Sequence, residues 1–532
     1  MTPSLPEEGF EAPDLPSAQL CISGFQVLGS TVFSSDQLNQ AIQQALRSTV
    51  GPPGDAPGCP WQLTFAQLLL VRTAVTDLYI QQGYVTSGAF IPANQRLQDG
   101  IVTLQAIEGR LADIRVDGTQ RLQPGYIASR LNLAASTPLN INQLLEGLQL
   151  LRLDPLIDTL SAELQAGLEV GTSRLQVDVA EADSFTMQAE LNNHRATSVG
   201  SLQRSLSLHQ GNLSGLGDGL DVVYSNTNGS NDVNVSYAVP ISPRNSTLGF
   251  TTRLAENRIV AGAFRPLGIS AETNEYSLIV EHPLIFTPEE QLTLGLSLSR
   301  RFSQTRLGFA NIGPFPLSPG ADSQGRTIVS ALRFSQTWTQ RQPNQVFALR
   351  SQFSLGLGGF LGGTVNGDPE QPDSRFFAWQ GQGQWVRRLG ADSLLLVQGN
   401  VQLATDELLS SEQLGLGGQS TVRGYRENAL LTDNGLLLSV EARFPILRAQ
   451  GIDGVLQIAP FIDAGYGWNA GSSAIDPAPL LGIGTGLMWQ QPNLSARLDW
   501  GIPLTSDGTS SPQSKRGLQE NGIYFSINYA FF

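Results

Sequence analysis

The fold is decided by residues 436–444, whose sequence is LLLSVEARF. Every second position from Leu436 to Phe444 is apolar, and Ser439, Glu441 and Arg443 lie between them. Successive side chains of a β-strand face opposite sides. The segment therefore predicts a strand with one apolar face and one polar face that carries charges.

The same alternation returns at 454–465 and 493–502. A soluble β-sandwich would turn such polar faces to bulk water and pack the apolar faces into a core. A transmembrane barrel would instead turn the apolar faces to lipid and the polar faces to a lumen. We favour the barrel. Charged residues make up only 15% of the chain, and Ser, Gln and Asn fill the polar positions. The absence of an apolar run of about 18 residues excludes a helical membrane protein but not a barrel, because half of each barrel strand is polar.

Helical patterns end near residue 184, and the barrel is predicted to occupy 184–532. We expect about sixteen antiparallel strands, an even number that closes a single-chain barrel without exposed edges. A barrel of this size encloses a water-filled lumen. The predicted strands are 184–193, 200–210, 218–226, 232–240, 246–253, 273–282, 290–301, 326–339, 344–355, 375–388, 393–404, 434–444, 454–465, 481–490, 493–502 and 521–532.

Two small α+β units are predicted ahead of the barrel, at 20–110 and 111–183, after a Pro-rich acidic leader at 1–19. In the first unit, Ser34 and Thr64 each precede a glutamine by three residues, which is the capping-box signature of a helix start. Strands are expected near 25–28, 86–92 and 101–108. The second unit repeats this β-α-α-β-β order, which indicates a tandem repeat. The alternative is one single α+β domain.

Composition excludes several functions. A net charge of −14 argues against nucleic-acid binding. The only lysine, Lys515, lies in no phosphate-binding loop, so no nucleotide is expected. His194, His209 and His282 lack the spacing of metal ligands, so we expect neither a metal nor another cofactor. Nothing in the sequence indicates an enzyme, and we expect no catalytic residues.

The chain has two cysteines, Cys21 and Cys59. They are either two unrelated thiols or one disulfide, and an oxidising compartment favours the disulfide. By the chain-entropy estimate, closing that loop would contribute roughly 3–4 kcal/mol.

A long connection at 406–433 contains a glycine-rich stretch that ends in Val422-Arg423-Gly424-Tyr425. No βαβ unit surrounds these glycines, which excludes a dinucleotide fingerprint. From spacing alone, an ordinary surface loop is as good an interpretation as a functional one. The strand at 454–465 carries Phe461-x-Asp463-x-Gly465, and its alternation places Asp463 on the polar side, facing the lumen.

These two motifs together resemble the outer-membrane superfamily of protein transporters and insertases. The front half narrows the resemblance to two-partner secretion transporters of the haemolysin secretion and activation type. Residues 83–87, 99–100 and 102–110 resemble their first POTRA (polypeptide-transport-associated) domain, and 138–140 and 148–155 resemble a cyanobacterial-type second one. Residues 192–193, 199–201 and 212–218 resemble the first barrel strands.

The resemblance implies a bacterial outer-membrane pore with its POTRA domains in the periplasm. It implies a partner that is a large secreted exoprotein, an adhesin or haemolysin, recognised unfolded and exported without nucleotide hydrolysis. It also implies that the arginine loop folds into the barrel, where Val422, Arg423, Gly424 and Tyr425 meet Phe461, Asp463 and Gly465. A barrel-assembly insertase is the alternative within the superfamily. A passive porin and a soluble binding protein are less favoured.

Overall fold

The computed structural model describes residues 19–56, 58–93, 95, 97, 99–368, 371–471, 479–506 and 517–531. The chain divides into two compact units, each considered separately here. Unit 1 comprises residues up to Gly118 together with Ile127–Arg152 and Thr159–Ala180. Unit 2 comprises Thr119–Tyr126, Leu153–Asp158 and everything from Glu181 onward. The predicted leader lies outside the described residues except for Gln19.

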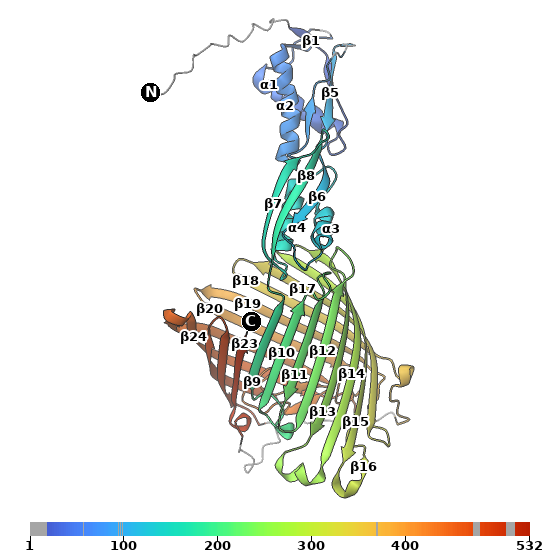
Figure 1. Ribbon diagram of the computed structural model, residues 1–532, viewed down its shortest axis with the longest axis vertical. Coiled ribbons are helices and arrows are strands. Elements are labelled where there is room, and N and C mark those ends of the chain that lie inside the picture. Colours follow the sequence, from blue (N-terminus) through green and yellow to red (C-terminus); the bar gives the residue numbers. More distant parts are fainter. Residues whose placement is uncertain are drawn as a thin grey trace. The chain divides into compact units, whose positions relative to one another are not determined.

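Unit 2 contains a closed antiparallel barrel, as predicted (Figure 1). Sixteen strands form the ring within the described residues, and the two-residue strand β16, Gly313–Pro314, only extends the edge of β15. In ring order the strands are β9 Phe185–Asn192, β10 Gln203–Gly211, β11 Gly219–Asn226, β12 Ser230–Pro240, β13 Thr247–Arg258, β14 Ile269–Phe286, β15 Glu290–Leu307, β17 Arg326–Gln342, β18 Gln345–Gly356, β19 Phe377–Gly390, β20 Ser393–Ala404, β23 Asn434–Ala449, β24 Gly454–Trp468, β25 Leu480–Gln490, β26 Leu494–Pro503 and β27 Ile523–Ala530. β27 then pairs with β9 and closes the ring.

Each of the sixteen predicted strands is present, but several are longer than expected. β14 and β15 both run for 18 residues, well beyond the predicted 273–282 and 290–301. The extra end of β15 at 302–307 carries polar residues on both faces, whereas β14 ends in the apolar residues Pro283 to Phe286. The alternation on which the predicted bounds rest therefore stops before the hydrogen bonding does. Short 3₁₀ turns lie in the loops at 197–199, 262–267, 309–311, 360–362, 450–452 and 519–521.

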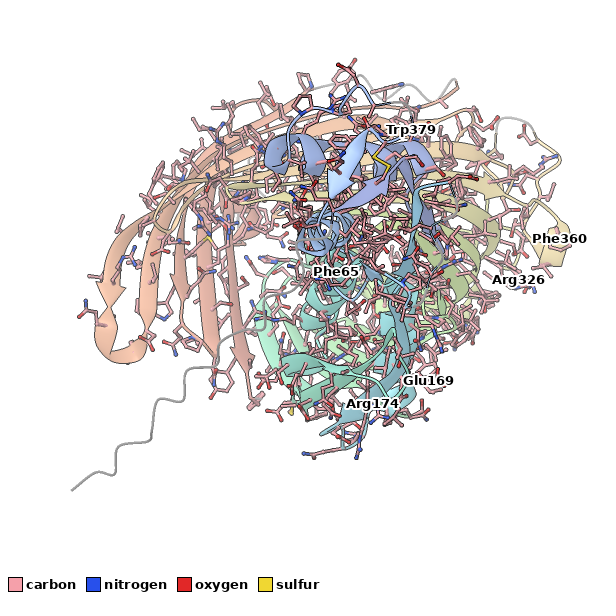
Figure 2. All side chains as sticks on the ribbon, turned by 90° about the horizontal axis from the view of Figure 1, so that it is seen from above. Phe65, Glu169, Arg174, Arg326, Phe360 and Trp379 are labelled. Atoms are coloured by element: carbon pink, nitrogen blue, oxygen red, sulfur yellow. A yellow bond between two sulfur atoms is a disulfide. The ribbon has the colours of Figure 1, made fainter. Side chains whose placement is uncertain are left out.

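The outer face of the barrel is apolar. On β23, Leu436 and Leu438 are 46% and 50% exposed, whereas Glu441, on the opposite face of the strand, is 6% exposed. Ile462 on β24 and Trp500 on β26 are likewise exposed. Figure 2 places Phe360, in the loop after β18, at the outer edge of the barrel. No helix in the described part of the chain is long and apolar enough to cross a membrane.

Unit 1 begins with the first predicted α+β repeat. Its helices are α1 Ser35–Thr49 and α2 Phe65–Gln81, and both start with the predicted capping box, formed by Ser34 with Gln37 and by Thr64 with Gln67. Its sheet has the order β2-β5-β4, formed by Gly24–Leu28, Ile101–Ile107 and Gly88–Phe90. The strand expected at 86–92 is thus only three residues long.

The second repeat has the same topology. It comprises β6 Arg110–Asp117, α3 Pro124–Ala134, α4 Ile141–Arg152, β7 Ile157–Ala166 and β8 Thr172–Glu181. Its sheet order is β6-β8-β7. In both repeats the first and last strands pair in parallel, and the middle strand takes the outer place next to the last one. The tandem repeat predicted from the sequence is confirmed in this sense.

A pair of short strands, β1 Leu20–Ile22 and β3 Trp61–Leu63, was not predicted. These strands bring the two cysteines together, and Cys21 and Cys59 form a disulfide (Figure 2). Sequence patterns of three residues are too short to show alternation, which is why this ribbon escaped the sequence analysis.

Glu108, at the end of β5, holds the loop that precedes α1. Its carboxylate accepts hydrogen bonds from the Thr31 and Val32 backbone N–H groups at 2.7 and 3.1 Å and from the Tyr79 hydroxyl at 2.9 Å. Burial acts to raise the pKa of Glu108, but these hydrogen bonds outweigh it and lower the pKa below its ordinary value. Burial raises the pKa of Tyr79 to about 12, so this hydroxyl remains a donor at any physiological pH.

Candidate functional site

The long loop at 405–433, between β20 and β23, folds into the barrel. Its two short strands, β21 Leu414–Leu416 and β22 Leu430–Thr432, pair with each other as a hairpin. Leu416, Val422 and Tyr425 are buried, and they pack in one cluster with Leu480 of β25. The glycine-rich segment that ends in residues 422–425 therefore lies inside the barrel. The alternative of an ordinary surface loop, which the spacing alone left open, does not describe it.

Arg423 lies at the centre of this site and is 4% exposed. Its backbone N–H and its Nε donate to Oδ2 of Asp463 at 3.0 and 2.7 Å, and its Nη2 donates to Oδ1 at 2.9 Å. This is a two-pronged guanidinium–carboxylate contact, which fixes direction as well as distance. The guanidinium carbon of Arg423 also lies 3.4 Å from the ring centroid of Phe461, which precedes Asp463 by two residues on β24.

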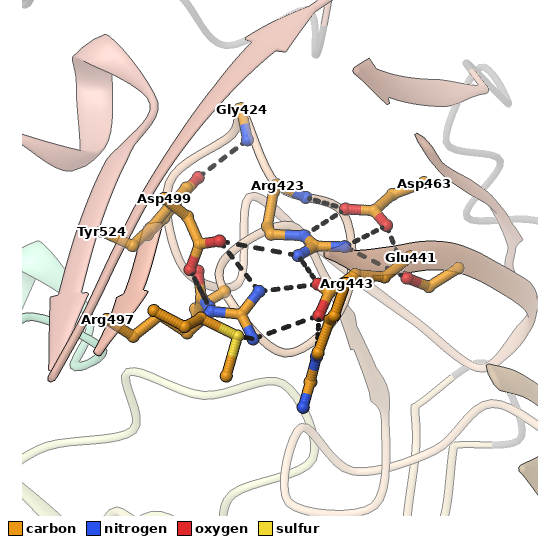
Figure 3. Close-up of polar contacts among 11 residues, drawn as sticks. Arg423, Gly424, Glu441, Arg443, Asp463, Arg497, Asp499 and Tyr524 are labelled. Carbon is orange, nitrogen blue, oxygen red and sulfur yellow. Dashed lines mark hydrogen bonds and ion pairs between the residues drawn. The ribbon is translucent and has the colours of Figure 1, made fainter. Parts of the chain in front are cut away.

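The remaining guanidinium nitrogen of Arg423, Nη1, donates to Oε2 of Glu441 on β23 at 2.6 Å and lies 3.8 Å from Oδ1 of Asp499 on β26. Arg497 contacts these same two acids, at 2.6 Å to Glu441 and 2.5 Å to Asp499 (Figure 3). Arg443 donates to Glu441 at 2.8 Å.

Three arginines thus face three carboxylates, so the site carries no net formal charge. Asp463 and Asp499 are fully buried and Glu441 is 6% exposed. Buried charges are tolerated when they are paired and hydrogen-bonded, as each of these is, whereas removal of one partner leaves a costly unpaired charge. We call these six side chains the arginine cluster: Arg423, Glu441, Arg443, Asp463, Arg497 and Asp499.

Glycines on the inner wall make room for the loop. A methyl group added to Gly465 would lie 2.7 Å from the Val422 side chain, and one added to Gly482 would overlap the backbone oxygen of Arg423. Similar close approaches occur at Gly435, Gly467 and Gly501. The loop backbone therefore lies directly against the strands, where larger residues would hold it away.

Gly424 and Tyr425 complete the tip of the loop. Gly424 has φ of +107°, which favours glycine, and its N–H donates to the Tyr524 hydroxyl of β27 at 3.0 Å. The Tyr425 hydroxyl lies 2.9 Å from the Leu481 backbone oxygen and 2.7 Å from the Thr505 hydroxyl. The tip is thus bonded to β24, β25 and β27 at once.

The structure brings all seven residues of the predicted loop site together: Val422, Arg423, Gly424, Tyr425, Phe461, Asp463 and Gly465. The sequence analysis missed Glu441 and Asp499 as partners of Arg423, and it missed Arg497 as the second arginine that binds these two acids. The sequence did indicate that these three side chains face the lumen, because Glu441, Arg497 and Asp499 lie on the polar faces of predicted strands. Alternation does not give the register between strands, however, and the register decides which charged side chains meet.

A closed barrel with an apolar outer face, tandem α+β units ahead of it and an arginine loop folded inside defines the class of outer-membrane barrels that transport or insert proteins. The chain belongs to the family described as haemolysin secretion/activation protein ShlB/FhaC/HecB, whose model matches residues 171–489. A model for the ShlB-type POTRA domain matches residues 56–109.

Curated relatives agree with this family. The chain is 23% identical over 501 residues to an outer membrane transporter CdiB of Escherichia coli, covering 91% of this chain and 79% of the relative. It is 22% identical over 419 residues to the heme/hemopexin transporter protein HuxB of Haemophilus influenzae, covering 76% and 70%. These relatives are transporters.

Solved structures show the same fold. CdiB from Escherichia coli superimposes with a TM-score of 0.72 at 21% identity, covering 100% of this chain and 93% of that one. BamA from Haemophilus ducreyi, without its first three POTRA domains, gives a TM-score of 0.54 at 13% identity, covering 96% and 100%. The chain is accordingly a two-partner secretion transporter of the outer membrane, with its POTRA domains in the periplasm and a barrel that exports a partner protein.

Proposed function

We propose that the transporter receives its partner as an unfolded polypeptide on the POTRA domains, assigned to 20–110 and 111–183, and passes it through the barrel at 184–532. The partner is a large secreted exoprotein of the adhesin or haemolysin type. The single observation that carries this proposal is the arginine cluster, which holds a long loop inside a barrel wide enough for an extended chain.

Val422, Arg423, Gly424 and Tyr425, with Phe461, Asp463 and Gly465, act in this proposal as a lock for the loop. A buried ion pair is weak support for stability, but it selects one position among many. A loop position that removes Arg423 would leave Asp463 buried without a cation and is therefore penalised, whereas Glu441 would keep Arg443 and Arg497. The lock therefore gives the loop one defined resting place in the lumen.

The receiving surface is the outer edge of β4. This strand stands at the end of the order β2-β5-β4, so within the described residues one of its sides has no neighbouring strand. The Ala89 N–H donates to the Thr76 hydroxyl of α2 at 3.1 Å, and an added strand would compete with that bond. Its last residue, Phe90, is 42% exposed beside that edge. An extended segment of the partner would add to β4 as a further strand, with backbone hydrogen bonds giving affinity independent of sequence.

Export in this proposal uses no nucleotide and no enzymatic step, and the outer face of the barrel is surrounded by outer-membrane lipid. A single lysine outside any phosphate-binding motif supports the absence of nucleotide chemistry. The composition likewise supports the absence of a nucleic-acid partner. Folding of the partner outside the cell is then the source of free energy for directional movement.

Deletion of the gene for this transporter in the bacterium that carries it tests the proposal. We expect one large exoprotein to disappear from the cell surface and the medium, while the amounts of other outer-membrane barrels stay constant. Re-expression of the chain restores secretion. A general fall in other barrels with unaffected exoprotein release would overturn the proposal and favour an insertase.

A further inference from the structure

A second group of charged side chains lies on the lumen wall, on strands that do not touch the arginine cluster. Arg301 of β15 and Arg333 of β17 face the interior, because Leu298 and Leu332 beside them are exposed on the outer face. Both arginines are largely buried, with 23% and 17% of their side chains exposed. They meet a carboxylate that comes from the loop itself.

That carboxylate belongs to Glu412, whose side chain is 12% exposed. Nη2 of Arg333 donates to Oε2 of Glu412 at 2.8 Å. Nη1 of Arg301 donates to the backbone oxygen of Ser411 at 2.8 Å and lies 3.8 Å from Oε1 of Glu412. The backbone oxygen of Glu412 accepts from Nε2 of Gln402 on β20 at 3.0 Å.

Apolar packing holds the same end of the loop. Leu408 and Leu409 are both 2% exposed and pack against Val329 and Ala331 of β17. Phe376 and Ala378, just before and within β19, complete this cluster. The segment 408–412 is therefore attached to β15, β17 and β19 by both charge and apolar contacts.

The two attachments of the loop are separated along the wall of the ring. From β17, where Glu412 is held, the ring passes through β18, β19 and β20 to β23 and β24, whose Glu441 and Asp463 hold Arg423. Between the two attachments, the Leu414 side chain lies against Gly435 of β23 and the Leu416 side chain against Gly467 of β24. The loop therefore follows the wall, and the two attachments fasten it at separate points.

We propose that Arg301 and Arg333 form a carboxylate-binding site on the lumen wall, which Glu412 occupies to fasten the resting loop to that wall and from which an acidic side chain of the exported polypeptide displaces it. This proposal rests on the proposed function for the identity of the displacing ligand. Two guanidinium groups facing one acid are the usual recognition chemistry for a carboxylate.

The contacts of Arg301 and Arg333 would allow Glu412 to be replaced by another carboxylate. Arg301 also binds Glu275 of β14 through two contacts of 2.7 and 2.9 Å, so it stays paired when Glu412 leaves. Arg333 has no other carboxylate within the described residues and keeps only the Ser299 hydroxyl. An incoming carboxylate would therefore satisfy Arg333. The arginine cluster differs, because all three of its acids belong to the barrel wall and its loop residue is the arginine, and two of these acids, Asp463 and Asp499, are fully buried.

Single-channel recording of the purified full-length protein in planar bilayers tests the fastening. We expect Glu412→Gln and Arg333→Gln each to raise the time-averaged conductance several-fold, since each removes the 2.8 Å ion pair. The matched control is Arg350→Gln, which removes a lumen-facing arginine of β18 that donates to Oε1 of Gln352 at 3.0 Å and forms no ion pair within the described residues. The charge swap Glu412→Arg with Arg333→Glu should return the conductance toward that of the wild type. A wild-type conductance in both single variants would overturn the fastening.

Polyglutamate added to the Glu412→Gln channel tests the ligand class. We expect it to block the current, and the additional Arg333→Gln change to raise the half-blocking concentration about tenfold, the equivalent of one charge-assisted hydrogen bond. Polylysine serves as the probe of opposite charge, and any block of the current by polylysine should not depend on Arg333. Equal block by polyglutamate with and without Arg333 would overturn the carboxylate site. Neither recording uses the secreted partner, so failure here is separate from failure of the proposed export function.

Discussion

Arg423 and Asp463, forty residues apart in the chain, are joined by three hydrogen bonds, one of which comes from the arginine backbone. The backbone bond ties the loop itself, and not only its side chain, to β24. The contact between Arg423 and Asp463 therefore has two parts. The hydrogen bond from the backbone N–H remains when the arginine side chain is replaced, whereas the ion pair with the guanidinium is lost.

Replacement of Arg423 by alanine should leave the barrel folded and strongly reduce secretion. The variant leaves Asp463 buried with Ser439 and a backbone N–H as its remaining donors, a change of the kind that costs about 3–5 kcal/mol locally. Lysine should restore little, because it cannot make the two parallel contacts or lie flat on Phe461. Secretion is measured at matched membrane abundance, with heat-modifiable migration as the folding control. Normal secretion by the alanine variant would contradict the proposed lock.

A methyl group at Gly482 should act like the loss of Arg423. It would overlap the Arg423 backbone oxygen, so the tip of the loop must leave the wall. Gly399 is the matched control, because it lies on a barrel strand and a methyl group there would have its nearest neighbour at 3.6 Å. We expect Gly482→Ala to reduce secretion and Gly399→Ala to leave it unchanged. The same secretion defect in both variants would point to barrel assembly rather than to loop position.

Acid should loosen the loop before α1 in the first POTRA domain. The pKa of Glu108 is lowered in the folded state, so the stability it contributes is fully present above its unfolded pKa and is lost as the pH falls through the folded value. Hydrogen exchange of residues 30–34 should therefore accelerate, relative to the intrinsic rate, below about pH 4.5. Glu108→Gln should exchange faster at neutral pH and lose most of this pH dependence. An unchanged profile in that variant would remove Glu108 as the cause.

Loss of the disulfide should destabilise the first POTRA domain and leave the barrel intact. Cys21 and Cys59 are 38 residues apart, and closing a loop of that length contributes about 3–4 kcal/mol in the chain-entropy model. The double variant Cys21→Ser and Cys59→Ser should show faster hydrogen exchange in β1, β3 and the helices that pack on them. The single variants are a useful comparison, since each also leaves an unpaired thiol. Exchange equal to that of the wild type in the double variant would show that the bond carries no stability.

Alternation along single strands was sufficient to predict the barrel, because the membrane imposes the same apolar face on every strand. Asp463 could be placed in the lumen for the same reason. Its companions could not be found this way: Glu441 and Asp499 lie on β23 and β26, and their meeting depends on strand register and on how far the loop descends. The second attachment at Glu412 has no local pattern at all. It depends on where the folded loop meets strands that lie far from it in the sequence.

An arginine introduced on the outer face of the barrel tests whether that face contacts hydrocarbon, which the outer-membrane assignment requires. Leu278, near the middle of β14, is 50% exposed, and the preceding Ser277 faces the lumen. In a bilayer, Leu278→Arg should destabilise the barrel by about 2–4 kcal/mol, whereas Ser277→Arg meets water and should cost little. Urea unfolding in lipid vesicles, with the folded fraction followed by gel migration, separates the two. Equal stability of the two variants would mean that the face carrying Leu278 does not contact hydrocarbon, and the outer-membrane assignment would fail with it.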